Sequence, residues 1–96
     1  MSYNGSVKYF DWSKEKNEKL KKERGINFND IVSILNNKQF LDVINNPSGK
    51  HSNQKVFVIG MNNYIYYVPF IEDKEKFFLK TIIPSRKATK RYLPKK

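Results

Sequence analysis

The sequence predicts an α+β fold, in which two N-terminal helices pack on an antiparallel sheet of four to five strands and a short helix closes the chain. Two early segments carry helix caps, β-branched and aromatic runs follow with short turns between them, and the C-terminal segment is strongly basic. The expected order is strand, helix, helix, four strands, helix. With 96 residues the chain fits one domain, residues 1–96.

The N-terminal part begins with an expected strand at residues 7–11, which Trp12 closes. Ser13 follows as a helix cap, because its hydroxyl can accept a hydrogen bond from a backbone N–H of the first turn. The helix then runs through Arg24. Gly25 ends it, since glycine enters the left-handed conformation without a steric penalty.

A second helix follows, and Asn27 is its expected cap. Its apolar residues fall at the i, i+3, i+4, i+7 spacing that forms one stripe, and they are Phe28, Ile31, Val32 and Leu35. This stripe is expected to face the core.

Four strands make up the expected sheet after the helices. They are residues 40–44, 54–59, 64–70 and 77–83, and a turn-rich loop at 45–49 follows the first of them. The later connections are short enough for hairpins, whereas parallel neighbours need crossovers of a dozen residues or more. The run is therefore expected to be an antiparallel meander.

The positive charge is concentrated at the C-terminus. The whole chain has a formal charge of +10; residues 1–73 contain ten basic and eight acidic side chains, and residues 74–96 contain nine and one. This tail is either a frayed, solubilising segment or an ordered basic helix. We expect the helix, because Tyr92 and Leu93 give it something to bury, and we expect a polyanionic or acidic partner.

Composition excludes several kinds of site. The chain has no cysteine and one histidine, so thiolate chemistry and zinc clusters are not expected, and no metal or cofactor is predicted. It also has no apolar run of roughly 20 residues and no basic-then-apolar leader, so we expect a cytoplasmic protein without membrane contact.

Two small groups of residues bear on nucleic-acid cleavage. His51 lies in a loop beside Lys50; it either moves a proton or is a solvated side chain. The acidic cluster Glu72, Asp73 and Glu75 is typical of a hairpin turn rather than a two-metal centre. RNA can be cleaved without a metal, because its own 2′-hydroxyl attacks the adjacent phosphate.

Four segments, taken in order, carry a resemblance: Phe10-Asp11-Trp12, KKERGINF at 21–28, His51-Ser52 ahead of VFVIG at 56–60, and IIPSRKATKRY at 82–92. Together they resemble the framework of the BrnT family of bacterial toxins. The resemblance implies a RelE-like fold and a metal-independent ribonuclease that cleaves messenger RNA, free or ribosome-bound, and inhibits translation. It also implies a DNA-binding antitoxin, through which alone operator DNA is contacted.

The resemblance carries roles to matching positions. The expected catalytic residues are His51 for proton transfer, Lys55 for phosphate binding and Arg86 for the charge of the transition state. The expected RNA-binding residues are Trp12, Lys14, Lys80, Lys87, Lys90, Arg91 and Tyr92. Pro84-Ser85-Arg86 replaces the family's more usual Ile-Ser-Ala-Arg, and Lys55 stands where Arg is common, without the planar fork of a guanidinium.

Each role has a structural alternative. Trp12 fits a core anchor, Lys14 a solvated first-turn residue, and Arg86 a partner of a carboxylate elsewhere. Two other functions also fit the chain. One is a non-catalytic RNA-binding module that combines the basic surface with an aromatic row, and the other is a protein whose basic helix docks on an acidic chain.

Overall fold

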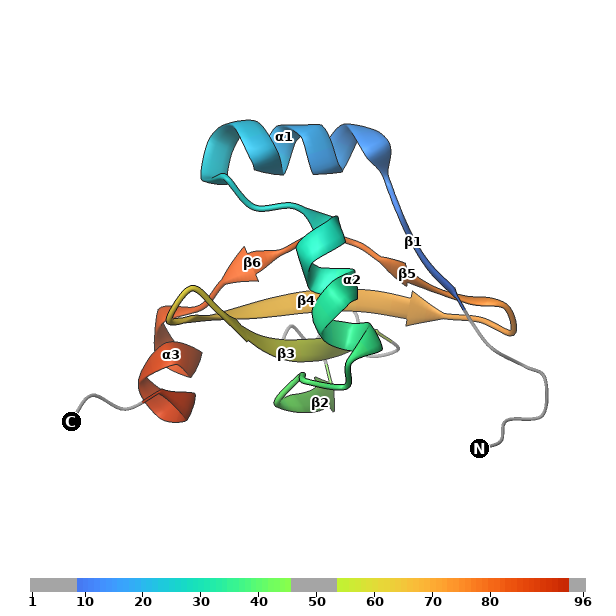
Figure 1. The fold of residues 1–96 in the computed structure, drawn as a ribbon. Coiled ribbons are helices and arrows are strands. Elements are labelled where there is room, and N and C mark those ends of the chain that lie inside the picture. Colours follow the sequence, from blue (N-terminus) through green and yellow to red (C-terminus); the bar gives the residue numbers. More distant parts are fainter. Residues whose placement is uncertain (1–8, 46–53, 94–96) are drawn as a thin grey trace.

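The computed structural model describes residues 9–45 and 54–93. Its elements are β1 (Tyr9–Trp12), α1 (Lys14–Arg24), α2 (Phe28–Asn36), β2 (Asp42–Asn45), β3 (Lys55–Met61), β4 (Tyr64–Glu72), β5 (Lys76–Leu79), β6 (Ile83–Pro84) and α3 (Arg86–Tyr92). The α+β class and the order of the predicted elements are confirmed (Figure 1).

The sheet is mixed rather than purely antiparallel, which corrects the sequence-based expectation. Its strands lie in the order β1-β5-β4-β3-β2, and β1 runs parallel to β5, with Tyr9 opposite Lys76 and Trp12 opposite Leu79. The hairpin rule concerns consecutive strands only. Two helices and three strands separate β1 from β5, so the connection is long enough for a parallel pair.

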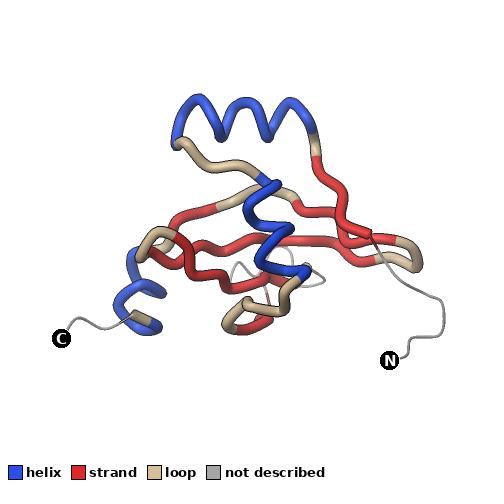
Figure 2. The backbone as a smooth tube through the Cα atoms, in the orientation of Figure 1, coloured by secondary structure: helices blue, strands red, loops and turns tan. Residues whose placement is uncertain are grey.

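The expected strand at 77–83 is broken into β5 and β6 (Figure 2). Both pieces pair with β4, but the register changes from Phe70 opposite Leu79 to Tyr67 opposite Ile83. From Phe70 to Tyr67 the chain advances three residues along β4, whereas from Leu79 to Ile83 it advances four. The segment between β5 and β6 therefore contains one extra residue, which is a β-bulge. The extra residue lies between Lys80, whose N–H still bonds the Pro69 carbonyl at 2.8 Å, and Ile83.

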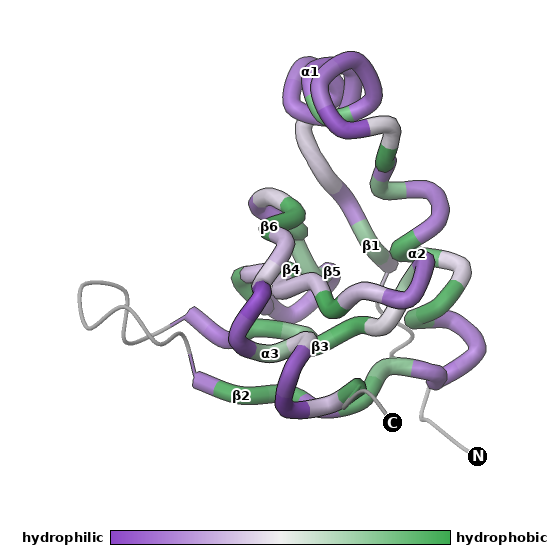
Figure 3. The backbone as a smooth tube through the Cα atoms, turned by 90° about the vertical axis from the view of Figure 1, so that its left-hand side faces the viewer, coloured by the Kyte–Doolittle hydropathy of each residue, from purple (hydrophilic) through white to green (hydrophobic). Residues whose placement is uncertain are grey.

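Helices α1 and α2 cover one face of the sheet. The predicted caps form: the Ser13 hydroxyl accepts from the Lys16 N–H at 3.2 Å, and Gly25 ends α1 with a φ of 69°. In α2 the predicted stripe is buried except at its edge, where Val32 is only partly covered. Figure 3 shows the contrast, since α1 is hydrophilic over almost its whole length whereas α2 alternates.

The core lies between α1, α2 and this face, and α3 packs against the opposite face. Alternation along the strands separates the two faces. Phe57 and Val68 belong to the core under α1 and α2, whereas Val58 and Ile65 contact Ala88 of α3. We call the two sides the α2 face and the α3 face. No helix among the described residues is long and apolar enough to cross a bilayer.

Candidate nucleic-acid interface

Helix α3 begins where the chain leaves the sheet at Ser85. The Ser85 N–H donates to the Ile65 carbonyl at 2.9 Å, which ties the start of the helix to β4. The Ser85 hydroxyl then accepts from the Ala88 N–H at 3.1 Å and so caps the first turn. The predicted basic helix is thus ordered, and its first residue is Arg86.

Thr89 fixes the inner side of α3. Its hydroxyl accepts from the Ile65 N–H at 2.9 Å and donates to the Ser85 carbonyl at 2.8 Å. Ala88 beside it is 2% exposed. Sequence inspection gave Thr89 no role; its only local signal was the spacing of four residues from the capping serine.

Tyr92 holds the last turn of α3 against β2. Its ring packs on the small cluster of Val58, Ile65 and Ala88, and its hydroxyl donates to a carboxylate oxygen of Asp42 at 3.3 Å. Partial burial, followed by the nearby negative charge of Asp42, raises the pKa of the Tyr92 phenol. The structure therefore gives Tyr92 a packing role, and its contact with RNA stays a prediction.

The outer side of α3 carries four exposed cations, Arg86, Lys87, Lys90 and Arg91, which we call the basic helix face. Arg86 and Lys90 are neighbours at i,i+4, as are Lys87 and Arg91, and such like-charge pairs each disfavour a helix by a few tenths of a kcal/mol. Cations in the first turn also oppose the helix dipole. In the described part of the chain, no carboxylate forms an ion pair with these four side chains.

Lys80 lies on the same side of the sheet as the basic helix face. Its ammonium sits 5.9 Å from the centre of the Phe78 ring. Phe78 alternates with Leu79, which is buried in the core of the α2 face, so Phe78 and Lys80 belong to the α3 face. Lys80, which directly follows β5 just before the bulge, thus adds a fifth exposed cation to this side.

Trp12 and Lys14 lie at the end of β1, next to the end of β5. The Trp12 ring stacks on Phe28 with the ring centres 5.8 Å apart, and it packs against the core. Lys14 is exposed in the first turn of α1. Because Trp12 is opposite Leu79, both residues lie close to the point at which Lys80 leaves the strand.

Lys55 lies away from the basic helix face. It is paired with Phe70, whereas α3 is bound to β4 through Ile65, and five residues of strand span roughly 16 Å. Lys55 also shares the α2 face with Phe57, where both line a pocket. The structure therefore brings Lys80, Arg86 and the α3 cations to one side, and it does not bring Lys55 to them.

The remaining candidates have separate outcomes. His51 lies outside the described residues, and its role stays a prediction. Asp73 accepts from the backbone N–H groups of Glu75 and Lys76 at 2.8 and 2.9 Å, which confirms the interpretation of the acidic segment as a turn. These hydrogen bonds, together with the Lys76 ammonium at 3.5 Å, lower the pKa of Asp73.

A comparison with protein families assigns the chain. The family model described as "Ribonuclease toxin, BrnT, of type II toxin-antitoxin system" matches residues 12–91. The chain belongs to the BrnT family. No curated protein and no solved structure matches it.

The BrnT match begins at Trp12, where β1 ends, and reaches Arg91 in the last turn of α3. It therefore includes both helices of the α2 face, the bulge after Lys80 and the whole basic helix face. BrnT membership makes the chain a ribonuclease toxin of a type II system, with RNA as its substrate and an antitoxin as its partner.

Proposed function

We propose that this BrnT toxin is a metal-independent endoribonuclease that cleaves messenger RNA and thereby inhibits translation. The observation that carries the proposal is the basic helix face, in which four exposed cations lack ion-pair partners among the described residues. Cations held in this way lower the electrostatic cost of extra negative charge on a phosphate.

The chemistry uses the RNA's own nucleophile. The 2′-oxygen bonds to the adjacent phosphorus as it loses its proton, the bond from phosphorus to the 5′-oxygen breaks, and that oxygen gains a proton. The products are a 2′,3′-cyclic phosphate and a 5′-hydroxyl. Arg86 stabilises the charge that develops on the phosphate oxygens, since a guanidinium offers two parallel donors to them. His51 is proposed to move the protons.

The other cations position the strand. Lys87 and Lys90 bind phosphates next to the cleaved bond, and Arg91 extends the path along α3. Lys80 binds a phosphate further along the RNA, since its N–H bonds Pro69, four residues along β4 from Ile65. Lys55 lies too far along the sheet to share a phosphate with Arg86, so any RNA contact it makes is at a distant nucleotide. Lys14 flanks the path near Lys80, and Trp12, whose ring packs on Phe28 in the core, positions the end of β1 beside it.

The antitoxin is proposed to carry a DNA-binding domain, so that operator DNA is bound only by the complex. The adjacent reading frame tests this part directly. A small protein with a ribbon-helix-helix or helix-turn-helix pattern is expected there, and the purified complex is expected to shift a fragment of the upstream DNA that the toxin alone does not shift.

The catalytic part is tested by incubating the purified protein with messenger RNA in chelator, with and without ribosomes. We expect cleavage in at least one of the two, with 2′,3′-cyclic phosphate ends. Intact RNA in both would contradict the proposal. Salt-sensitive binding of uncut RNA would identify the chain as the non-catalytic RNA-binding module instead.

A further inference from the structure

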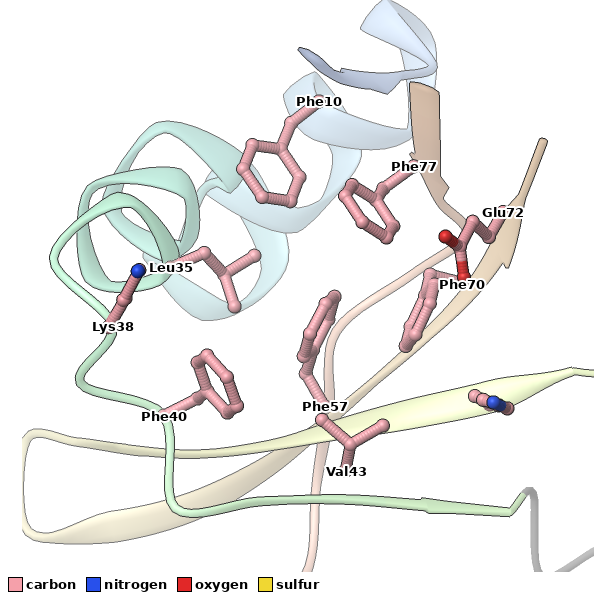
Figure 4. A pocket seen from close by; sticks show the side chains of 10 residues that line it. Phe10, Leu35, Lys38, Phe40, Val43, Phe57, Phe70, Glu72 and Phe77 are labelled. Atoms are coloured by element: carbon pink, nitrogen blue, oxygen red, sulfur yellow. The ribbon is translucent and has the colours of Figure 1, made fainter. Parts of the chain in front are cut away.

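A pocket of about 440 Å³ opens on the α2 face (Figure 4). Lys55 and Phe70 in its lining are paired with each other, five residues along β4 from Ile65, to which α3 is bound. Its lining consists mainly of five phenylalanines, which are Phe10, Phe40, Phe57, Phe70 and Phe77. We call it the phenylalanine pocket. The segments that form it come from β1, the end of α2 and the chain after it, and the four strands β2 to β5, so it exists only in the folded chain.

The floor of the pocket is built from rings packed on one another. Phe57 and Phe70 are 6% and 3% exposed, and their rings stack with centres 4.1 Å apart. Phe40 meets the Phe57 ring edge-on at 5.4 Å, and Phe10 stacks on Phe77 at 5.3 Å. Because each ring is fixed by another ring, the opening is already formed before anything enters it.

The rim of the pocket is charged. Lys38 and Lys55 line it and are both exposed; Lys38 follows α2 in the left-handed conformation, and Lys55 begins β3. Glu72 lines it as well and has interactions of its own. Val43 of the edge strand β2 adds an apolar border and is 39% exposed.

This chemistry decides between two kinds of occupant. A nucleobase stacks on phenyl rings but also needs hydrogen-bond partners for the polar edges of its ring, and the inner walls here are five phenyl rings, Leu35 and Val43, with Lys38, Lys55 and Glu72 only at the rim. A large apolar side chain in the pocket gains free energy because its whole apolar surface is removed from water. Carboxylates beside it on the same segment would meet Lys38 and Lys55 at the rim.

We propose that the phenylalanine pocket receives a large apolar side chain from an acidic segment of the antitoxin. This inference rests on the proposed function, because it assigns a surface to the antitoxin partner of that toxin. Charge complementarity supports the choice, since two of the three charged side chains at this rim are lysines, Lys38 and Lys55, beside the single carboxylate of Glu72. The pocket and the basic helix face lie on opposite faces of the sheet, so apart from Lys55 at the rim, antitoxin anchoring and RNA binding use different residues.

The test titrates purified toxin variants against the protein encoded in the adjacent reading frame. Val43→Asp places a carboxylate at the border of the pocket, and Lys38→Glu reverses a rim charge. We expect each to weaken binding about tenfold or more, as for substitutions at the centre of an interface. The matched control is Ile71→Asp, since Ile71 is 42% exposed on the α3 face, and its affinity is expected to stay within about threefold of the original.

Several results would overturn the inference. The first is equal affinity of the original toxin and the three variants for the neighbouring protein. The second is an equal loss of affinity in Val43→Asp and Ile71→Asp, and the third is no binding of the original toxin to that protein. Loss of RNA affinity in Val43→Asp would make the pocket a nucleotide site, and a dimer of the toxin that Val43→Asp dissociates would make it a self-association site. Thermal melting of each variant checks that it is folded.

The measurements distinguish an error in the pocket proposal from an error in the ribonuclease proposal. Val43→Asp and Lys38→Glu lie outside the proposed RNA-binding residues, so both variants are expected to cleave RNA at the original rate and to resist neutralisation. If the original toxin leaves RNA uncut while the pocket variants still lose the neighbour, only the ribonuclease proposal falls. If RNA is cut and every variant is neutralised equally, only the pocket falls.

Discussion

Helices α2 and α3 have similar lengths, nine and seven residues, but opposite relations to the sheet. Helix α2 buries Phe28, Ile31 and Leu35 in the core, whereas α3 buries little more than Ala88 and displays four cations. Helix α2 thus contributes buried apolar side chains to the core, and α3 contributes exposed cations to the surface. Substitutions in α2 should therefore change stability, and substitutions in α3 should change activity.

The largest expected effect is on stability, at the centre of α2. Ile31 is fully buried, so Ile31→Asp places an unpaired charge in the core and is expected to cost about 4–5 kcal/mol or more, enough to unfold a domain of this size. Val32→Asp, one residue along at the edge of the stripe, should cost clearly less. Urea denaturation followed by circular dichroism compares the two; equal losses would contradict the observed boundary of the core.

The next effect is on activity, in the first turn of α3. Cells that express Arg86→Ala should need about a hundredfold more inducer to reach the same growth inhibition. The melting temperature of the variant should stay unchanged, because an exposed arginine adds little stability. Arg24→Ala, at the exposed end of α1, is the matched control and should stay toxic. An unfolded Arg86→Ala protein would instead show that Arg86 is structural.

A smaller effect is expected in the salt dependence of RNA binding. Replacing Lys87 and Lys90 with alanine should lower the slope of log affinity against log salt by about 0.7 for each lost phosphate contact on a single strand. The matched pair Lys19 and Lys22 has the same spacing on α1 and should leave the slope unchanged. Fluorescence anisotropy at several salt concentrations measures both; similar slopes for the two double variants would mean that binding is spread over the whole surface.

The smallest effect concerns the contact of Tyr92 with Asp42. The pKa of this phenol is higher in the folded chain than in the unfolded chain, so its contribution to stability is complete below pH about 10 and disappears as the pH rises through the folded value. The melting temperature of Tyr92→Phe should be almost that of the original protein at pH 7, and it should fall less steeply than the original protein's above about pH 10. Identical alkaline profiles would show that the hydroxyl contact is unimportant in solution.

Local features of the fold were predictable from sequence, whereas contacts between distant segments were not. Ser13, Gly25 and Asn27 act through neighbours within a few residues, and all three cap or end helices as expected. The parallel pairing of β1 and the bulge after Lys80 depend on which strands meet in space, and no local pattern encodes that. The sequence therefore predicted the elements better than their pairing.

In the candidate site too, local features were predictable and contacts between distant segments were not. The basic helix was predictable because its charges and its burying residues are contiguous in the chain. The separation of Lys55 from Arg86 was not, because it depends on which end of β4 each one approaches. The phenylalanine pocket was not predictable for the same reason, since its rings come from five separate segments between Phe10 and Phe77.

The central claim is that the cations of the α3 face stabilise charge on an RNA phosphate without a divalent ion. Its most direct test is single-turnover cleavage of one messenger RNA in chelator by the original protein and by Arg86→Ala, with RNA affinity measured alongside. We predict a cleavage rate at least about a hundredfold lower in Arg86→Ala, with affinity within about threefold. Equal rates for the two proteins, or cleavage that appears only when a divalent ion is added, would contradict the claim.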